Sequence, residues 1–306
     1  MNQIFERARS FMYRNARPID LARWKLHFEG GSPEEILSCL AAYQNPDGGF
    51  GHGLECDALN PESSPMQSWS ATTYLRLIDM YDPAHPIVAG LLRYLTSGRD
   101  FDGHRWAYSV ASNNDHPHAP WWHYDAAAPR FDYNPTAALA GYMLRASEPG
   151  SAANDLARRI AREAFDWAME RELPPEMHLL PGLRTLCWDV MVACPELFDA
   201  AVLLARIEKR MVELVEADAD KWDSEYCATP STFIMGPQDP LLVPLGALAM
   251  READWLLDKQ EADGAWPITW SWGEESAAFH LSASYWRGGL IFKNLFTLLG
   301  AGKITI

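Results

Sequence analysis

The segment from Asn113 to Asp125 concentrates side chains that can bind a metal ion or move a proton. Its histidines and aspartates offer imidazole nitrogens and carboxylate oxygens, which are common ligands of divalent transition metals. The pattern His116-x-His118 is plausible local spacing for two ligands of one ion. We therefore predict a divalent metal site with His116, His118 and His123 as ligands. The alternative interpretation is a polar loop whose side chains satisfy backbone groups.

Aromatic residues form a second candidate set, because the chain holds 13 Trp, 11 Tyr and 12 Phe. Trp270 and Trp272 lie in a stretch without helical period. Aromatic faces stabilise carbocations by about 0.5–2 kcal/mol each when desolvated, and they also stack on sugar rings. Core filling between helices is an equally open interpretation. The predicted ligand-binding residues are Tyr74, Trp121, Trp122, Trp270, Trp272, His280 and Trp286.

Several carboxyl groups lie near the expected starts of helices. A carboxyl in an apolar cavity has a raised pKa and can act as a general acid, and a pair of carboxyls suits glycoside hydrolysis. A solvated surface position is the alternative for each of them. These acids are Glu55, Asp57, Asp115, Asp125, Glu274 and Glu275, and our catalytic candidates among them are Asp57, Asp115, Asp125 and Glu274.

Helices must position these residues, because no stretch of the chain shows a convincing period-2 strand pattern. Side-chain caps followed by proline mark several helix starts: Ser32-Pro33, Ser64-Pro65, Asn134-Pro135 and Asp239-Pro240. Apolar residues then recur at helical spacing. The expected helical stretches follow Pro65 (to Tyr81) and Pro86 (to Leu95), and further ones cover 134–147, 151–171, 181–194, 198–217, 242–261 and 284–299. The fold class is therefore all-α.

A short turn motif recurs along the chain. Gln44, Asp47, Gly48 and Phe50 hold the same offsets as Gln260, Asp263, Gly264 and Trp266. Degenerate copies run from Asp102 to Trp106 and from Asp218 to Trp222. The period is roughly fifty residues, which is enough for two helices and their loops. Gly lets the chain reverse, Gln and Asp can bond exposed backbone, and the aromatic can fill the gap between hairpins. We interpret the Gln and Asp residues as structural.

The two clearest copies, 40–51 and 255–266, resemble the QW-type repeat of the terpenoid cyclase and protein prenyltransferase superfamily. The helix from Ser70 resembles the inner helix after such a turn, and 285–299 resembles a closing inner helix of bacterial single-toroid members. The resemblance implies an α/α toroid of about five to six helical hairpins, formed as one domain over residues 1–306. It also implies a central cavity and isoprenoid substrates, but no particular activity.

The motifs that define activity in the superfamily differ here. The sequence has no Asp-x-Asp-Asp acid, no Asp-Asp-x-x-Asp for metal-bridged diphosphate, no thioester Cys-Gly-Glu-Gln and no lanthionine-cyclase zinc strings. The zinc pattern of prenyltransferase β-subunits is approached only by Glu225-Tyr226-Cys227 together with His280. Whether the protein is an enzyme is therefore left open by the sequence.

The composition limits the classes of molecule that the protein is expected to bind. The net charge of −15 disfavours nucleic acid and anionic membranes. The five cysteines show no CxxC spacing, which predicts reduced thiols, and we expect a cytoplasmic protein without a secretory signal or transmembrane segment. Our leading hypothesis is a toroid that binds, and can convert, an apolar isoprenoid-like small molecule. The alternatives are a carbohydrate-active enzyme that uses Asp/Glu and Trp, and a non-catalytic scaffold.

Overall fold

The computed structural model describes residues 3–236 and 238–306, and the fold-class prediction of an all-α protein is confirmed within them. They form twelve α-helices joined by loops and short 3-10 turns, and their extended segments make only isolated bridges. The α-helices are α1 (Gln3–Asn15), α2 (Pro18–Phe28), α3 (Pro33–Ala41), α4 (Pro65–Leu77), α5 (Pro86–Thr96), α6 (Tyr133–Ala146), α7 (Ala152–Met169), α8 (Leu179–Ala193), α9 (Ala200–Leu214), α10 (Pro230–Phe233), α11 (Gly246–Lys259) and α12 (Ala277–Gly300).

Several helix boundaries differ from the predicted ones. The stretch predicted over 242–261 forms a helix only from Gly246 to Lys259, because the segment after the Asp239 cap is a short 3-10 turn (Pro240–Leu242). Three further differences have a local cause. The stretch after Pro65 ends at Leu77 rather than Tyr81, because Asp79 takes the left-handed backbone conformation (φ 51°). α6 is capped by Asp132, whose carboxylate accepts from the Asn134 N–H at 2.7 Å, and not by Asn134. α12 begins after the Ser276 cap, several residues earlier than 284, so that it includes His280.

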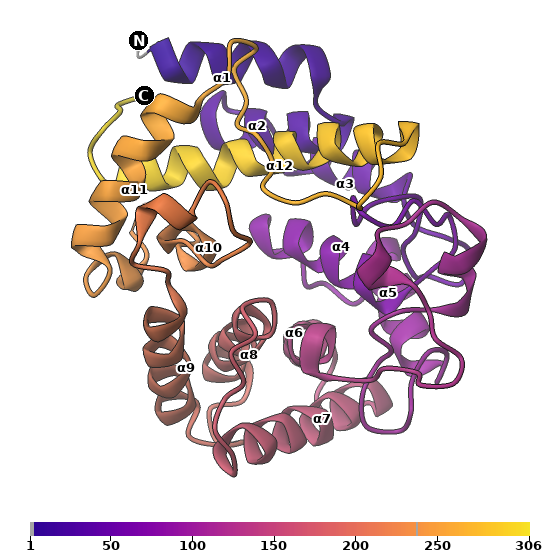
Figure 1. The fold of residues 1–306 in the computed structure, drawn as a ribbon. Coiled ribbons are helices and arrows are strands. Elements are labelled where there is room, and N and C mark those ends of the chain that lie inside the picture. The colour runs from indigo at the N-terminus through magenta and orange to yellow at the C-terminus, as the bar shows by residue number, and fades with distance from the viewer. Residues whose placement is uncertain (1–2, 237) are drawn as a thin grey trace. The chain divides into compact units, whose positions relative to one another are not determined.

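The contacts divide the chain into two compact units. Unit 1 comprises the described residues up to Ile36 together with Lys209–Ile306, and unit 2 comprises Leu37–Glu208. Unit 1 therefore joins the two ends of the described chain. In it α12 packs against α1, α2, α10 and α11 (Figure 1). Its core is apolar and includes Phe11, Trp24 and Phe292.

Unit 2 is organised around α6, which contacts α4, α7 and α8 (Figure 1). Every residue of α6 except Arg145 is buried. Small residues allow close packing: a Cβ on Gly141 would lie 2.6 Å from the Asp189 carboxylate of α8. Arg76 of α4 binds that same carboxylate at 2.6 Å and also donates to the Ala138 carbonyl of α6 at 2.7 Å. A partly buried ion pair thus connects α4, α6 and α8.

The two clear copies of the turn motif dock on neighbouring helices in the same way, one in each unit. In unit 2 the Gln44 amide donates to the Gly48 carbonyl (3.0 Å) and to the Ile87 carbonyl at the start of α5 (2.9 Å). A Cβ on Gly48 would lie 2.0 Å from the Gly90 carbonyl oxygen, one helical turn further on. This glycine has φ 95°. The chain therefore reverses against the backbone of α5.

In unit 1 the same contacts recur on α1. The Gln260 amide donates to the carbonyls of Gly264 and Ile4, both at 2.9 Å. A Cβ on Gly264, which has φ 103°, would lie 2.0 Å from the Arg7 carbonyl oxygen. The predicted hydrogen bonding of the motif glutamines to backbone is confirmed in both copies. The closing aromatics Phe50, Trp106, Trp222 and Trp266 are all buried, as expected for gap filling.

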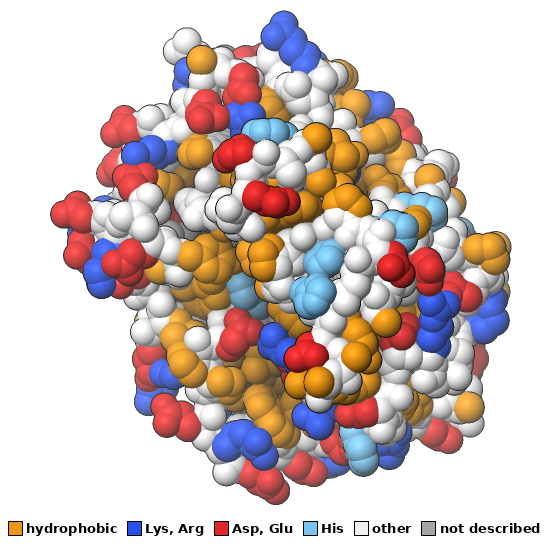
Figure 2. All heavy atoms as spheres, turned by 45° about the vertical axis from the view of Figure 1, so that its right-hand side comes forward, with side chains coloured by type: hydrophobic (Ala, Val, Ile, Leu, Met, Phe, Trp, Pro, Cys, Tyr) orange, Lys and Arg blue, Asp and Glu red, His pale blue; other side chains and the backbone are white. Residues whose placement is uncertain are grey.

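The structure also bears on two predictions from composition. The five cysteines are free thiols. Within residues 3–236 and 238–306, no helix combines the length and the apolarity that a membrane span requires. On the face drawn in Figure 2, Lys and Arg side chains are interspersed with Asp and Glu.

Candidate functional site

One side of α12 in unit 1 differs from the rest of the helix surface. Its opposite side faces α2 and the connection from α1, where a Cβ on Gly288 would lie 3.8 Å from both Ala16 and the Asp20 carboxylate. Trp286, Gly289 and Lys293 stand at i, i+3 and i+7 and therefore share the other side. We call these three residues the α12 stripe. It extends about 10 Å along the helix at 1.5 Å per residue.

Aromatic rings bound one end of the α12 stripe. The rings of Trp270 and Trp286 meet edge to face with centroids 5.3 Å apart, and the exposed Tyr226 contacts Trp270 in the same way at 6.1 Å. The indole Nε1 atoms of both tryptophans are buried without a hydrogen-bond partner among the described residues. Ring contacts rather than polar bonds therefore hold these tryptophans, as expected for an apolar wall.

Open space lies over the middle of the stripe, at Gly289. A Cβ built on Gly289 would meet no atom within 4 Å. A glycine inside a helix costs about 0.5–1 kcal/mol relative to alanine. A Cβ on the neighbouring Gly288 would lie at ordinary contact distance from Ala16 and Asp20, whereas a Cβ on Gly289 would meet no protein atom within 4 Å. The absence of a side chain at this position thus leaves room beside Trp286.

Lys293 lies at the other end of the α12 stripe, and its amine differs from those of the other lysines in its contacts. It is partly exposed, and within the described residues its amine makes neither a hydrogen bond nor an ion pair. The other lysines all form ion pairs: Lys25–Glu35, Lys209–Glu213, Lys221–Glu216, Lys259–Asp223 and Lys303–Asp254. Burial lowers the pKa of the Lys293 amine, and the Glu252 carboxylate partly offsets this effect.

Glu252 is a buried carboxylate held by the short helix α10. It accepts hydrogen bonds from the Ser231 N–H (2.7 Å) and the Ser231 hydroxyl (2.6 Å), and both residues are almost inaccessible. Its charge is therefore fixed in place near the stripe. The arrangement brings together an apolar wall, open space and an unpaired amine within one unit.

The structure brings Trp270 and Trp286 together but places the other predicted residues of unit 1 elsewhere. Trp272 is buried against Phe279, with centroids 6.0 Å apart, and fills core space. His280 is exposed and pairs with Glu275 at 3.2 Å, and Glu274 is exposed as well. Gly289, Lys293 and Glu252 were not among the residues predicted from the sequence. The sequence does contain a feature that could have indicated Lys293: it is the only charged residue between Arg287 and Lys303.

In unit 2 the histidine-rich segment is a tightly bonded loop. Its backbone pairs with the segment of Asp57: the Ala119 N–H donates to the Asp57 carbonyl at 2.8 Å. The buried Asn60 amide donates to Asn113 (2.9 Å), and the Asn113 amide donates to the Trp122 carbonyl at 3.0 Å. These bonds match the interpretation of a polar loop that satisfies backbone groups.

Two of the three predicted metal ligands lie close together. The His118 and His123 rings stack with Nε2 and Nδ1 3.3 Å apart, while the other His118 nitrogen binds the His116 carbonyl at 2.7 Å. Across the described residues, no three His, Cys, Asp or Glu side chains are grouped so that they could hold a metal ion.

The remaining predicted residues of unit 2 are dispersed. Asp115 and Asp125 are exposed, and Asp125 accepts from the Ala127 N–H at 2.9 Å. Trp121 is exposed, whereas Trp122 is buried against Tyr108 at 4.7 Å. Asp57 and Tyr74 are both buried.

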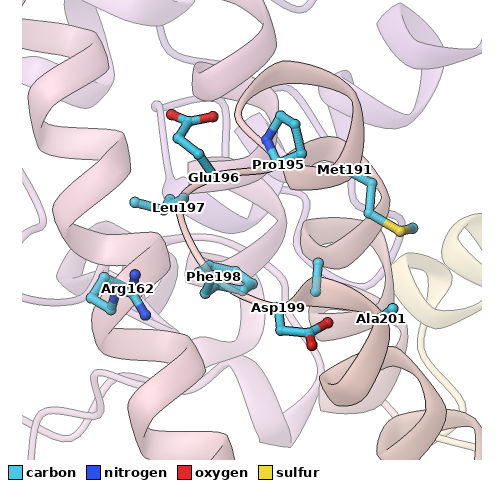
Figure 3. A pocket seen from close by; sticks show the side chains of 9 residues that line it. Arg162, Met191, Pro195, Glu196, Leu197, Phe198, Asp199 and Ala201 are labelled. Atoms are coloured by element: carbon cyan, nitrogen blue, oxygen red, sulfur yellow. The ribbon is translucent and has the colours of Figure 1, made fainter.

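A surface pocket of about 470 Å³ opens in unit 2 between α7 and the connection from α8 to α9 (Figure 3). Phe198 stacks on Phe165 at 4.4 Å, and the Arg162 guanidinium lies 5.6 Å from the Phe198 ring centroid. Glu196 at the rim pairs with Arg158 at 2.7 Å. None of the predicted site residues lines this pocket.

Comparison with protein-family models, with curated proteins and with solved structures gave no match. The resemblance to the terpenoid cyclase and prenyltransferase superfamily therefore stays a prediction.

Proposed function

We propose that the protein binds a small apolar, isoprenoid-like molecule in unit 1, over Gly289 and against Trp270 and Trp286. The observation that carries this proposal is the open space over a mid-helix glycine beside an aromatic wall. Ligand sites are typically lined by aromatic and apolar groups with a few polar ones. An apolar body of about 10 Å matches the length of the α12 stripe.

We also propose that the helices close into the α/α toroid that the resemblance implies. Support comes from the all-helical composition of the described residues and from the equivalent turn contacts on α1 and α5. The scaffold hypothesis predicts no small-molecule binding, and the carbohydrate hypothesis predicts sugar binding. A single ligand panel therefore separates the three.

The panel contains citronellol, farnesol, farnesyl diphosphate, a linear polyprene and neutral oligosaccharides. Binding is measured by quenching of tryptophan fluorescence and by the shift in melting temperature, since a ligand at 100 times its Kd stabilises a protein by about 2.7 kcal/mol. We expect the uncharged isoprenoids to bind, and Trp286→Ala to weaken their binding at least about tenfold, because a buried aromatic contact is worth about 1.4 kcal/mol or more.

The exposed Trp121 in unit 2 provides the matched control, and Trp121→Ala should bind like the wild type. If no isoprenoid binds, or if Trp286→Ala binds as tightly as the wild type, the proposal is wrong. Binding of an oligosaccharide instead, lost in Trp286→Ala, would favour the carbohydrate-active alternative.

A further inference from the structure

We propose that Lys293 is a nucleophile that forms a reversible imine with an apolar aldehyde or ketone bound over Gly289. This inference rests on the proposed function, because it assigns the chemical class of the ligand at the same site. It starts from position: Lys293 lies one turn from Gly289 on the same side of α12, and a Cβ on Gly289 would meet no atom within 4 Å.

The amine is free to react. Of the six lysines in the chain, five have a carboxylate within 4.0 Å, and Lys293 has no such partner within the described residues. A lysine becomes nucleophilic when a poorly solvated setting favours its neutral form. Burial acts in this direction on Lys293, since it lowers the pKa of the amine.

Charge favours a carbonyl compound over an acid as the partner of this amine. Glu252 is close enough to Lys293 for an electrostatic interaction, and its carboxylate is buried and held by Ser231. An anionic head group brought to Lys293 would be repelled by Glu252. The net charge of −15 acts in the same sense. A neutral aldehyde or ketone meets the amine without this repulsion.

The step is balanced without any oxidant or reductant. The Lys293 nitrogen attacks the carbonyl carbon and forms a C–N bond. The two hydrogens of the neutral amine leave with the carbonyl oxygen as water, which breaks the C–O bond and leaves a C=N bond. Addition of water reverses the reaction. The rings of Trp270 and Trp286 would contact the apolar part of the ligand, and the imine would hold the carbonyl end of the ligand.

The experiment traps this imine. The full-length protein is incubated at pH 7 with limiting citronellal, an apolar isoprenoid aldehyde, and with cyanoborohydride, which reduces an imine to a stable secondary amine. Peptide mass spectrometry then quantifies the modified fraction of each lysine. We expect Lys293 to be modified at least about tenfold more than any other lysine, although it is less exposed than Lys209. Excess citronellol should suppress this labelling.

Two variants make the test specific. Lys293→Arg should lose the label, and Gly289→Leu, which keeps the amine but fills the space, should lose it as well. Labelling spread evenly over the exposed lysines, while citronellol still binds, would overturn the proposal and leave the proposed function intact. If citronellol fails to bind and Lys293 is not labelled, both proposals are overturned.

Discussion

At the scale of single residues, His27 on α2 should make unit 1 sensitive to acid. Its ring meets Phe292 and Phe296 with centroids 5.7 and 5.1 Å away, and its Nε2 is buried without a hydrogen-bond partner among the described residues. Burial, and then the charge of Arg23, lowers the pKa of His27 to about 4. The ring is therefore neutral in the fold near pH 6.

The sign of the effect follows from proton uptake. An unfolded histidine has a pKa near 6.5, so between about pH 6.5 and 4 the unfolded chain binds more protons and the fold loses stability as the pH falls. The ring is partly exposed, and we expect a loss on the order of 1 kcal/mol. Melting temperatures between pH 7 and 4 should fall less steeply in His27→Leu than in the wild type. His123→Leu removes an exposed histidine as the control, and identical slopes in all three proteins would contradict this prediction.

The sequence shows the type of each side chain, but it does not show what surrounds that side chain in the fold. Trp270 and Trp286 were predicted from their types and do lie in contact. Trp272 has the same type, but it is buried against Phe279. Lys293 was not predicted from the sequence. Its amine is unusual because, within the described part of the chain, no carboxylate from elsewhere pairs with it, and hydrophobic periodicity gives no information on contacts between residues distant in sequence.

At the scale of elements, the turn motif was readable from sequence but its docking partners were not. The motif residues bind the backbone carbonyls of Ile4 and Ile87, and a carbonyl carries no sequence signal. Glycine is needed in the motif for two reasons: its φ is positive, and a Cβ would clash with the backbone of the neighbouring helix. The two reasons can be tested separately. Gly103 of the degenerate copy has φ 99°, but a Cβ there would meet nothing within 4 Å, so it isolates the backbone requirement.

We therefore expect Gly48→Ala and Gly264→Ala to destabilise the protein by about 2 kcal/mol or more, and Gly103→Ala to cost less. The two motif turns lie in different units, so the damage should be local. Hydrogen exchange should show lost protection in α5 for Gly48→Ala and in α1 for Gly264→Ala. Equal losses for all three variants, or the same helix affected by both motif substitutions, would refute the docking role of these glycines.

At the scale of the whole molecule, the sequence established the all-helical class and most helix positions. Apolar periodicity and side-chain caps involve residues that are close in sequence, so helices can be predicted from them without knowledge of the tertiary contacts. The division into two units is not local, since unit 1 combines α1 and α2 with α10, α11 and α12. The contacts between these ends join residues more than two hundred positions apart in the sequence, such as the Gln260 amide and the backbone carbonyl of Ile4.

If an apolar ligand occupies the space over Gly289, a side chain that fills this space should displace the ligand. Binding of citronellol and farnesol is measured for the wild type, Gly289→Leu and Gly246→Leu. Gly246 lies at the start of α11, where a Cβ likewise meets nothing within 4 Å. Replacing a helical glycine with leucine should raise stability by about 0.5–1 kcal/mol. We expect Gly289→Leu to bind both alcohols at least about tenfold more weakly (about 1.4 kcal/mol) and to keep its melting temperature. Gly246→Leu should bind them like the wild type. Unchanged binding by a folded Gly289→Leu would contradict a ligand site over Gly289.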